Sequence, residues 1–340
     1  MSTSADPTPA TEARELLSRR FLRGSLLGER EAAFLAAAEI QLPEPPPLDA
    51  PTLERATAMV EPVTSHLMKN LPDPESFPGS ALRLMELVDN PDVQVNQLIG
   101  LVSQDPAVSA TILRCANSAF YARGGAVQNL AGAVRRLGLR EVARIATGVA
   151  SRSLYDVGVR VEFAMFGARW GSLFHEALTC GFLSGWLSTE RRTGDSSRAF
   201  LGGMFHHIGK SIALRSVAAL KMDGKLPPDI LDLEIDLVLE QIHIEIGVDL
   251  MSLWSLPSYL MTICEHHHDD AVDGSKPNEA DVVRLCAGLY ELSKGPCVDP
   301  GIPQSVAGSA RLLRMEPPQL KAAAAKAAEL GGQVSSMFSV

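Results

Sequence analysis

Apolar residues recur at three- and four-residue intervals through most of the chain, whereas the strict alternation typical of half-buried strands is rare. The clearest case lies in residues 161–188, where large apolar side chains follow one another at four-residue steps: Trp170, Phe174, Leu178, Phe182 and Trp186. This spacing places them on one face of a helix, where they can pack in a core. The pattern predicts an all-α protein.

Helix start and stop signals divide this pattern into short helices with short connections. Asp105-Pro106 is a capping aspartate followed by a proline in the first turn, and Gly138 closes the stretch 130–137. Consecutive prolines interrupt the pattern in QLPEPPPLDAP (residues 41–51) and favour an extended linker. We therefore expect an N-terminal extension with its linker (1–50), a body (51–277) with a lobe boundary near residue 158, and C-terminal helices (278–340) packed on the second lobe.

Two adjacent histidines, His206 and His207, lie in the apolar stretch FLGGMFHHIGK (residues 200–210). Neighbouring side chains on a helix point about 100° apart, so both can face one pocket only at a helix end or in a turn. We expect Gly209 to supply that end, because glycine tolerates the left-handed conformation that closes helices. Further histidines follow in helical contexts, namely His243 and the run His266, His267 and His268.

Composition narrows the classes of partner. The net charge is −9 and the sequence pI is near 5.4, which argues against broad binding to nucleic acids or anionic membranes. Apolar runs stay short of the ~20 residues that span a bilayer, and the N-terminus lacks the order of a signal peptide, so we expect a cytoplasmic protein. The five cysteines are far apart and form no CxxC, which predicts buried thiols.

Several stretches together resemble a known family. DPAVSATILRCANSAFY (105–121), AVRRLG (133–138), GGMFHHIGK (202–210), HIEIGVDLMSLWSLP (243–257) and HH (267–268) are similar to the HDOD domain, over roughly residues 65–275. The resemblance implies a two-lobed helical HDOD fold, in which an N-terminal helical lobe (51–158) packs on a lobe like that of HD phosphohydrolases (159–277). It also implies bacterial signalling proteins, often tied to cyclic-di-GMP, motility or stress, that generally lack demonstrated hydrolase activity.

The resemblance also implies where a metal site would lie. Active HD hydrolases hold divalent metals with an early helical histidine, a His-Asp pair and a later aspartate. Here His207 stands in the position of the bridging aspartate, and an imidazole usually gives one nitrogen to one metal. This change weakens the case for a binuclear site. The early position is Ser172 in one alignment and His175 in another, and the sequence leaves both open.

The leading hypothesis is a signalling or scaffold module without catalysis or cofactor, which binds other signalling proteins or a small nucleotide-like ligand. Its candidate binding residues are Asn117, Ser118 and Lys210, although a backbone cap at Asn117 and a solvated Lys210 are the simpler interpretations.

The alternative is a metal-dependent phosphohydrolase or phosphodiesterase, with His206, His207 and Lys210 at its centre. Its divalent metal would be bound by residues from the set His175, His206, His207, His243, His267 and His268. The competing structural interpretation pairs these imidazoles with backbone carbonyls, and His243 with Glu240 one turn before it. A third hypothesis is a homo-oligomer that pairs through the Ala-rich C-terminal helix.

Overall fold

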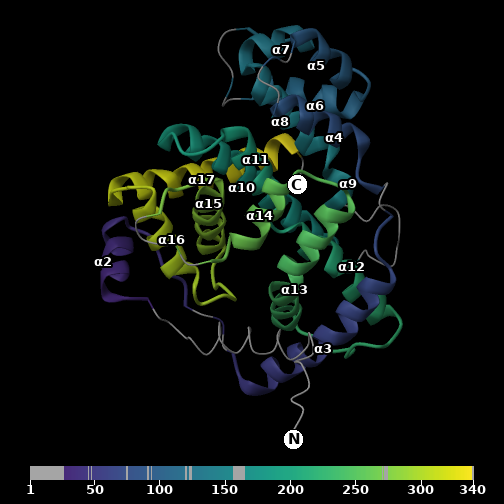
Figure 1. The fold of residues 1–340 in the computed structure, drawn as a ribbon, viewed down its shortest axis with the longest axis vertical. Helices are drawn as coiled ribbons and strands as arrows, with labels where there is room; N and C mark the ends of the chain where they lie inside the picture. Colours follow the sequence, from purple (N-terminus) through teal and green to yellow (C-terminus); the bar gives the residue numbers. More distant parts are fainter. Residues whose placement is uncertain are drawn as a thin grey trace, which may run out of the picture.

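The computed structural model of the chain describes residues 27–44, 46, 48–73, 76–89, 92, 94–118, 121, 125–155, 165–269, 271 and 275–338. Within these residues every regular element is a helix, which confirms the predicted all-α class. Figure 1 shows a smaller group of helices above a larger helical body, as expected for two lobes.

The smaller group is organised around its last helix, which contacts each of the other four. Its members are α4 (Gly79–Asp89), α5 (Val95–Val102), α6 (Pro106–Asn117), α7 (Leu130–Leu137) and α8 (Leu139–Ala150). The predicted caps are confirmed. The Asp105 carboxylate accepts hydrogen bonds from the backbone amides of Ala107 and Val108, and Gly138 adopts a φ of 86° between α7 and α8.

The larger body carries the long apolar helix that the sequence predicts. Its helices are α3 (Ala50–Lys69), α9 (Arg152–Tyr155), α10 (Gly167–Arg191), α11 (Ser196–Phe205), α12 (Ile208–Met222), α13 (Asp232–Leu253), α14 (Ser258–His266) and α15 (Glu279–Lys294). The long apolar helix is α10, which packs along α11 and α15, while α12 packs along α13. The start expected at residue 161 lies outside the described residues. Trp254 and all five cysteines are buried, as predicted.

Helix α3 differs from expectation in its placement. The sequence assigned it to the first lobe, but it packs on α12 and α13 of the larger body (Figure 1). The apolar face of α3 is buried there, and Arg55 on its polar side forms ion pairs with Asp229 and Glu234. The pairing partners lie more than 170 residues away in the chain, so local sequence signals carried no information about this contact.

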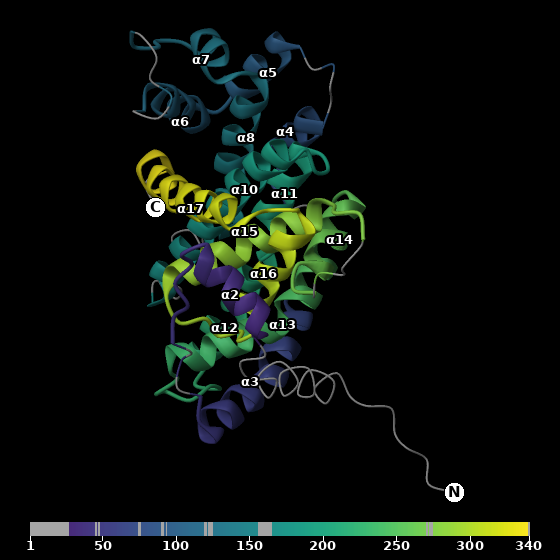
Figure 2. The same cartoon turned by 90° about the vertical axis from the view of Figure 1, so that its left-hand side faces the viewer.

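The two last helices, α16 (Ile302–Leu312) and α17 (Pro317–Phe338), cover α15 and α10 (Figure 2). The Ala-rich α17 buries its apolar face within the chain, through Ala323, Ala327, Leu330 and Val334. Helix α2 (Glu29–Ala37) packs on α16 and α17, held by an ion pair between Glu31 and Arg311. Among the described residues, none of the helices is both long and apolar enough to cross a membrane.

Gly209 has a different role from the one expected. Helix α11 ends at Phe205 and α12 begins at Ile208, so the two histidines themselves form the turn. Gly209 lies in the first turn of α12 and is not among the residues with positive φ, so the prediction of a left-handed helix end there was wrong. A Cβ atom at this position would overlap the backbone carbonyl oxygen of His243. Glycine is needed because the backbones of α12 and α13 touch.

We expect Gly209→Ala to lower the free energy of unfolding by about 3 kcal/mol or more, because backbone atoms on both helices would have to move. The matched control is Gly171→Ala on α10, where an added Cβ meets nothing within 4 Å. That change should be neutral or should stabilise by about 0.5–1 kcal/mol through helix propensity. Urea unfolding followed by circular dichroism measures both. Equal effects of the two substitutions would contradict the contact.

Candidate functional site

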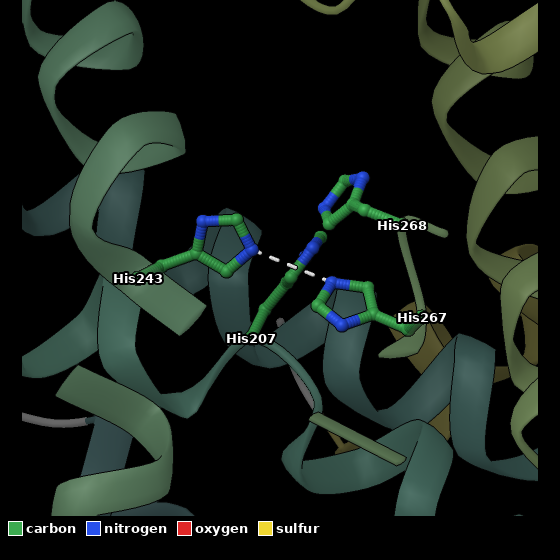
Figure 3. Close-up of side chains that lie close together, drawn as sticks. All are labelled: His207, His243, His267 and His268. Carbon is green, nitrogen blue, oxygen red and sulfur yellow. Dashed lines mark hydrogen bonds between the residues drawn. The ribbon is translucent and has the colours of Figure 1, made fainter. Parts of the chain in front are cut away.

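Four histidines from three parts of the chain meet in the larger body. His207 lies at the start of α12, His243 on α13, and His267 and His268 directly after α14. Figure 3 shows their rings converging on one point. Each offers one ring nitrogen, and these atoms lie within 4.8 Å of one another. We call this group the histidine cluster (His207, His243, His267 and His268).

Hydrogen bonds on the outer side of the rings fix which nitrogen carries the proton. The Nδ1 atoms of His243 and His267 lie 2.8 and 2.7 Å from the backbone carbonyls of Glu240 and Cys264. A carbonyl only accepts, so Nδ1 must donate and the lone pair of each neutral ring sits on Nε2. The two Nε2 atoms are 3.4 Å apart and face each other. Two lone pairs at this separation repel unless a proton or a metal ion lies between them.

His207 is fixed in the same way by a carboxylate. Its Nδ1 lies 2.5 Å from Oε1 of Glu176 on α10, and Oε2 of Glu176 accepts from the Lys294 ammonium group at 3.1 Å. The Nε2 atom of His207 is buried and has no hydrogen-bond partner among the described residues. Burial lowers the pKa of His207 well below its usual value, as it does for His267, so both rings are neutral at pH 7. A neutral imidazole is the form that binds metals.

His268 lies between two carboxylates. Its Nε2 is 3.2 Å from Oε1 of Glu240, outside hydrogen-bonding geometry, and its Nδ1 is 3.6 Å from Oδ2 of Asp299. The second oxygen of Glu240 accepts from the Lys210 ammonium group at 2.7 Å. Burial alone would raise the pKa of Glu240, but the charge of Lys210 outweighs it and the pKa lies well below its usual value. Glu240 is therefore ionised.

Two lysines and several carboxyl groups surround the cluster. The ammonium groups of Lys210 and Lys294 pair with the carboxylates of Glu240 and Glu176, and Asp299 lies 3.6 Å from His268. A fourth carboxyl, Glu291, lies 3.3 Å from Lys294, and burial together with Glu176 raises its pKa to about 7. Buried negative charge is costly unless it is compensated. The buried carboxylates around the cluster would favour a bound cation.

A cavity of about 740 Å³ opens beside the cluster. Three cluster histidines reach its wall, and residues of α15 and the following loop form another side of it, including Glu291, Lys294, Cys297 and Asp299. Ser172, the alternative early position, also lines it. This volume lies within the range of pockets that hold small-molecule ligands.

The structure brings together some of the predicted residues and separates others. His206 stacks on His207 with ring centroids 3.9 Å apart, and its Nδ1 donates to the Gly203 carbonyl. His175 lies elsewhere, with its ring nitrogens bonded to the Tyr290 hydroxyl and the Gly331 carbonyl.

Three expectations about single side chains can now be judged. The expectation of a solvated Lys210 was wrong. Its ammonium group pairs with Glu240 inside the body, and only 8% of the residue is exposed. We also expected His243 to bond to the Glu240 side chain, but its Nδ1 bonds to the Glu240 backbone carbonyl instead. The Asn117 amide has a backbone role, as expected, but it pairs with both backbone groups of Val127 in the loop before α7 and not with the end of its own helix; Ser118 bonds to the Cys115 carbonyl.

Sequence reasoning missed Glu176, Lys294 and Asp299. A signal was present for Glu176, which is the only residue with an acidic or basic side chain (Asp, Glu, Lys or Arg) between Trp170 and Thr189. A single charge within an apolar helix must have a buried partner. Lys294 and Asp299 lie 118 and 31 residues from the groups they face, and nothing near them in the sequence marks this role.

Comparison with known proteins identifies the family. Residues 75–270, more than half of the chain, match the family model of the HDOD domain. The chain belongs to the HDOD domain family. An HDOD domain protein of unknown function from Geobacter sulfurreducens superposes with a TM-score of 0.62 at 17% identity, over 84% of this chain and 99% of that one. The resemblance drawn from the sequence motifs is thereby confirmed, as is the HDOD fold.

Two further relatives have functional names. A candidate metal-dependent phosphohydrolase from Shewanella amazonensis SB2B superposes with a TM-score of 0.58 at 19% identity, over 80% of this chain and 99% of that one. A candidate signal transduction protein from Marinobacter aquaeolei VT8 gives a TM-score of 0.55 at 19% identity, over 89% and 69% of the two chains. An uncharacterized protein from Treponema pallidum (strain Nichols) is 24% identical over 217 residues, and the chain spans about 40% of that protein's length.

We expect the metal-free HDOD protein to lose stability between pH 6.5 and 4. Burial lowers the pKa of His206 from 6.5 to about 4, so the unfolded state binds more protons in this window and the free energy of unfolding falls as pH falls. For this group the total loss is on the order of 3 kcal/mol. Urea unfolding at a series of pH values should therefore show a shallower slope for His206→Gln. The exposed His266→Gln is the control, and equal slopes in the two variants would contradict the assignment.

Proposed function

We propose that this chain is a non-catalytic HDOD signalling module that binds one divalent transition-metal ion, of the zinc class, at the histidine cluster. The convergence of Nε2 lone pairs carries this proposal. His243 and His267 have their protons held on the outer side of the rings, and their Nε2 atoms face each other at 3.4 Å. Ligands on a tetrahedral ion at about 2.05 Å are about 3.3 Å apart, close to this separation.

The donor set fits such an ion. Imidazole nitrogens suit zinc, copper and nickel, whereas magnesium and calcium prefer oxygen ligands. The four residues are held by outer groups of the kind that orient metal ligands, namely the Glu176 carboxylate, two backbone carbonyls and the carboxylates around His268. When bound, the ion would supply positive charge close to the buried carboxylates around the cluster. The ion would also tie α12, α13 and the end of α14 together.

Four protein ligands also argue against turnover. Catalytic zinc sites keep one position open for water or substrate, while structural sites use four protein ligands. The carboxylate oxygens of Glu176 already contact His207 and Lys294, so neither is free to bridge two ions. A closed site favours a regulatory role, in which metal binding sets the stability of the body and the shape of the adjoining cavity. The partners that we propose are other signalling proteins, or a small nucleotide-like ligand in the cavity. A role in cyclic-di-GMP, motility or stress signalling is part of the proposal only because the family resemblance implies it.

We expect the purified protein to bind one equivalent of Zn²⁺ or Co²⁺, and His243→Ala to weaken binding by roughly 100-fold or more, since one of four ligands is lost. At a free ion concentration of 100 times Kd, the metal should add about 2.7 kcal/mol of stability and raise Tm by several degrees. Competition titration, elemental analysis and thermal unfolding with and without chelator measure these effects. His66→Ala, on α3 and outside the cluster, where the ring bonds to Ser216, should bind as the wild type does. Wild-type protein that binds no metal under any of these conditions would overturn the proposal.

A second candidate function is a metal-dependent phosphohydrolase with a histidine-rich site. The cavity favours it, since it joins the cluster to the Lys210 and Lys294 ammonium groups. The test is turnover of bis-p-nitrophenyl phosphate, nucleotides and cyclic dinucleotides with Mn²⁺, Co²⁺ or Zn²⁺. We expect none above background. Robust turnover that is lost in His207→Ala and kept in His66→Ala would replace the non-catalytic proposal with this one.

A further inference from the structure

The segment that follows the family match contributes charged groups to the site. The HDOD match ends at residue 270, and α15 begins at Glu279. From this later part of the chain, Lys294 reaches Glu176 at 3.1 Å and Asp299 reaches His268 at 3.6 Å. We refer to residues 279–305 as the C-terminal segment.

Lys294 acts on the cluster through one intermediate carboxylate. Glu176 is buried, with 2% of its surface exposed, and its two oxygens are divided between His207 and Lys294. The contact to His207 places the proton on Nδ1 and turns Nε2 towards the other three histidines. Without Lys294, the second oxygen of Glu176 would lose its charged partner in a region from which water is largely excluded.

The position of Lys294 is itself held from several sides. Its ammonium group lies 4.7 Å from the centre of the Tyr290 ring and 3.3 Å from Glu291 on the same helix. The Tyr290 hydroxyl donates to Nδ1 of His175, whose Nε2–H donates to the Gly331 carbonyl of α17. His175 therefore connects α10, α15 and α17, which keeps Lys294 directed at Glu176.

Asp299 supports the opposite side of the cluster. Its Oδ1 accepts a hydrogen bond from the backbone amide of Gly301 at 2.8 Å, which fixes the side chain just before α16. The other oxygen, Oδ2, faces Nδ1 of His268. With Asp299 beside the outer nitrogen, Nε2 of His268 is directed inwards, where it also lies 3.2 Å from Glu240. A carboxylate at the outer nitrogen increases the basicity of a metal-ligating histidine.

From this geometry we infer that the C-terminal segment is part of the metal site, with Lys294 and Asp299 as positioning residues for the ligands His207 and His268. The inference rests on the proposed metal-binding function. It adds that an HDOD body ending at residue 270 would bind the ion more weakly, because two of the four ligands would lose their outer support.

The test uses the full chain, stripped of metal and titrated with Co²⁺, whose visible absorption reports ligand geometry. Lys294→Met should weaken Co²⁺ binding by roughly 10- to 100-fold and change the absorption bands. Lys294→Arg, which keeps a cation near Glu176, should restore much of the affinity. The matched control is Lys225→Met, which removes an exposed lysine that pairs with Asp223 at 2.8 Å. It should bind as the wild type does.

Asp299→Asn is a second, independent test, because it removes the negative charge beside His268. Asparagine can still accept a hydrogen bond from the Gly301 amide, so the fold before α16 is kept. We expect a similar loss of Co²⁺ affinity with unchanged stability of the metal-free protein. If wild-type protein binds Co²⁺ and both Lys294→Met and Asp299→Asn bind it equally well with the same spectrum, the inference is overturned while the proposed function stands. If the wild type binds no metal, the proposed function itself fails. A variant that is only less stable, with wild-type spectrum and affinity, would show a structural role and also overturn the inference.

Discussion

The arrangement of this protein depends on the close packing of three helices at two glycines. Gly209 on α12 lies against the His243 carbonyl of α13, and a Cβ at Gly247 on α13 would come within 2.7 Å of the Cys264 sulfur of α14. These contacts hold α12, α13 and α14 nearer to one another than side chains would otherwise permit. The same three helices carry the four histidines at or near the contacts. The cluster is thus a product of backbone packing, and the histidines occupy the space that this packing leaves.

The identity of one residue decides the chemistry of the site. An aspartate in the place of His207 would bring a negative charge and two oxygens that can bridge ions. The imidazole brings no charge and one inward lone pair, because its other nitrogen is committed to Glu176. Negative charge is instead found on carboxylates that lie next to the cluster histidines or to Lys210, namely those of Glu176, Glu240 and Asp299. Under the proposed function, such a layer of carboxylates would attract a cation to the site and orient its ligands, and it would leave the ion without the bridging group of a hydrolytic centre.

Local sequence patterns were sufficient for the fold class, for the caps at Asp105 and Gly138, and for the position of the histidine pair in a turn. They were insufficient wherever a long-range partner decides the outcome. Lysine prefers water, so only the position of Glu240 explains why Lys210 is buried. His175 and Glu176 are neighbours in the sequence, but local patterns do not reveal that His175 bonds to Tyr290 while Glu176 bonds to His207. The role of Gly209 was misjudged for the same reason, since a close contact with another helix leaves no trace in the residues around it.

Gln304 connects two parts of the molecule that the sequence keeps far apart. Its side chain lines the cavity, and its carbonyl oxygen accepts a hydrogen bond from the backbone amide of Gly28, at 3.3 Å, just before α2. The docking of α2 on α16 and the occupation of the cavity therefore involve the same side chain. A ligand that took the Gln304 amide as a partner would compete with Gly28 for it, so its binding would weaken the docking of α2 by the same free energy by which that docking weakens its binding.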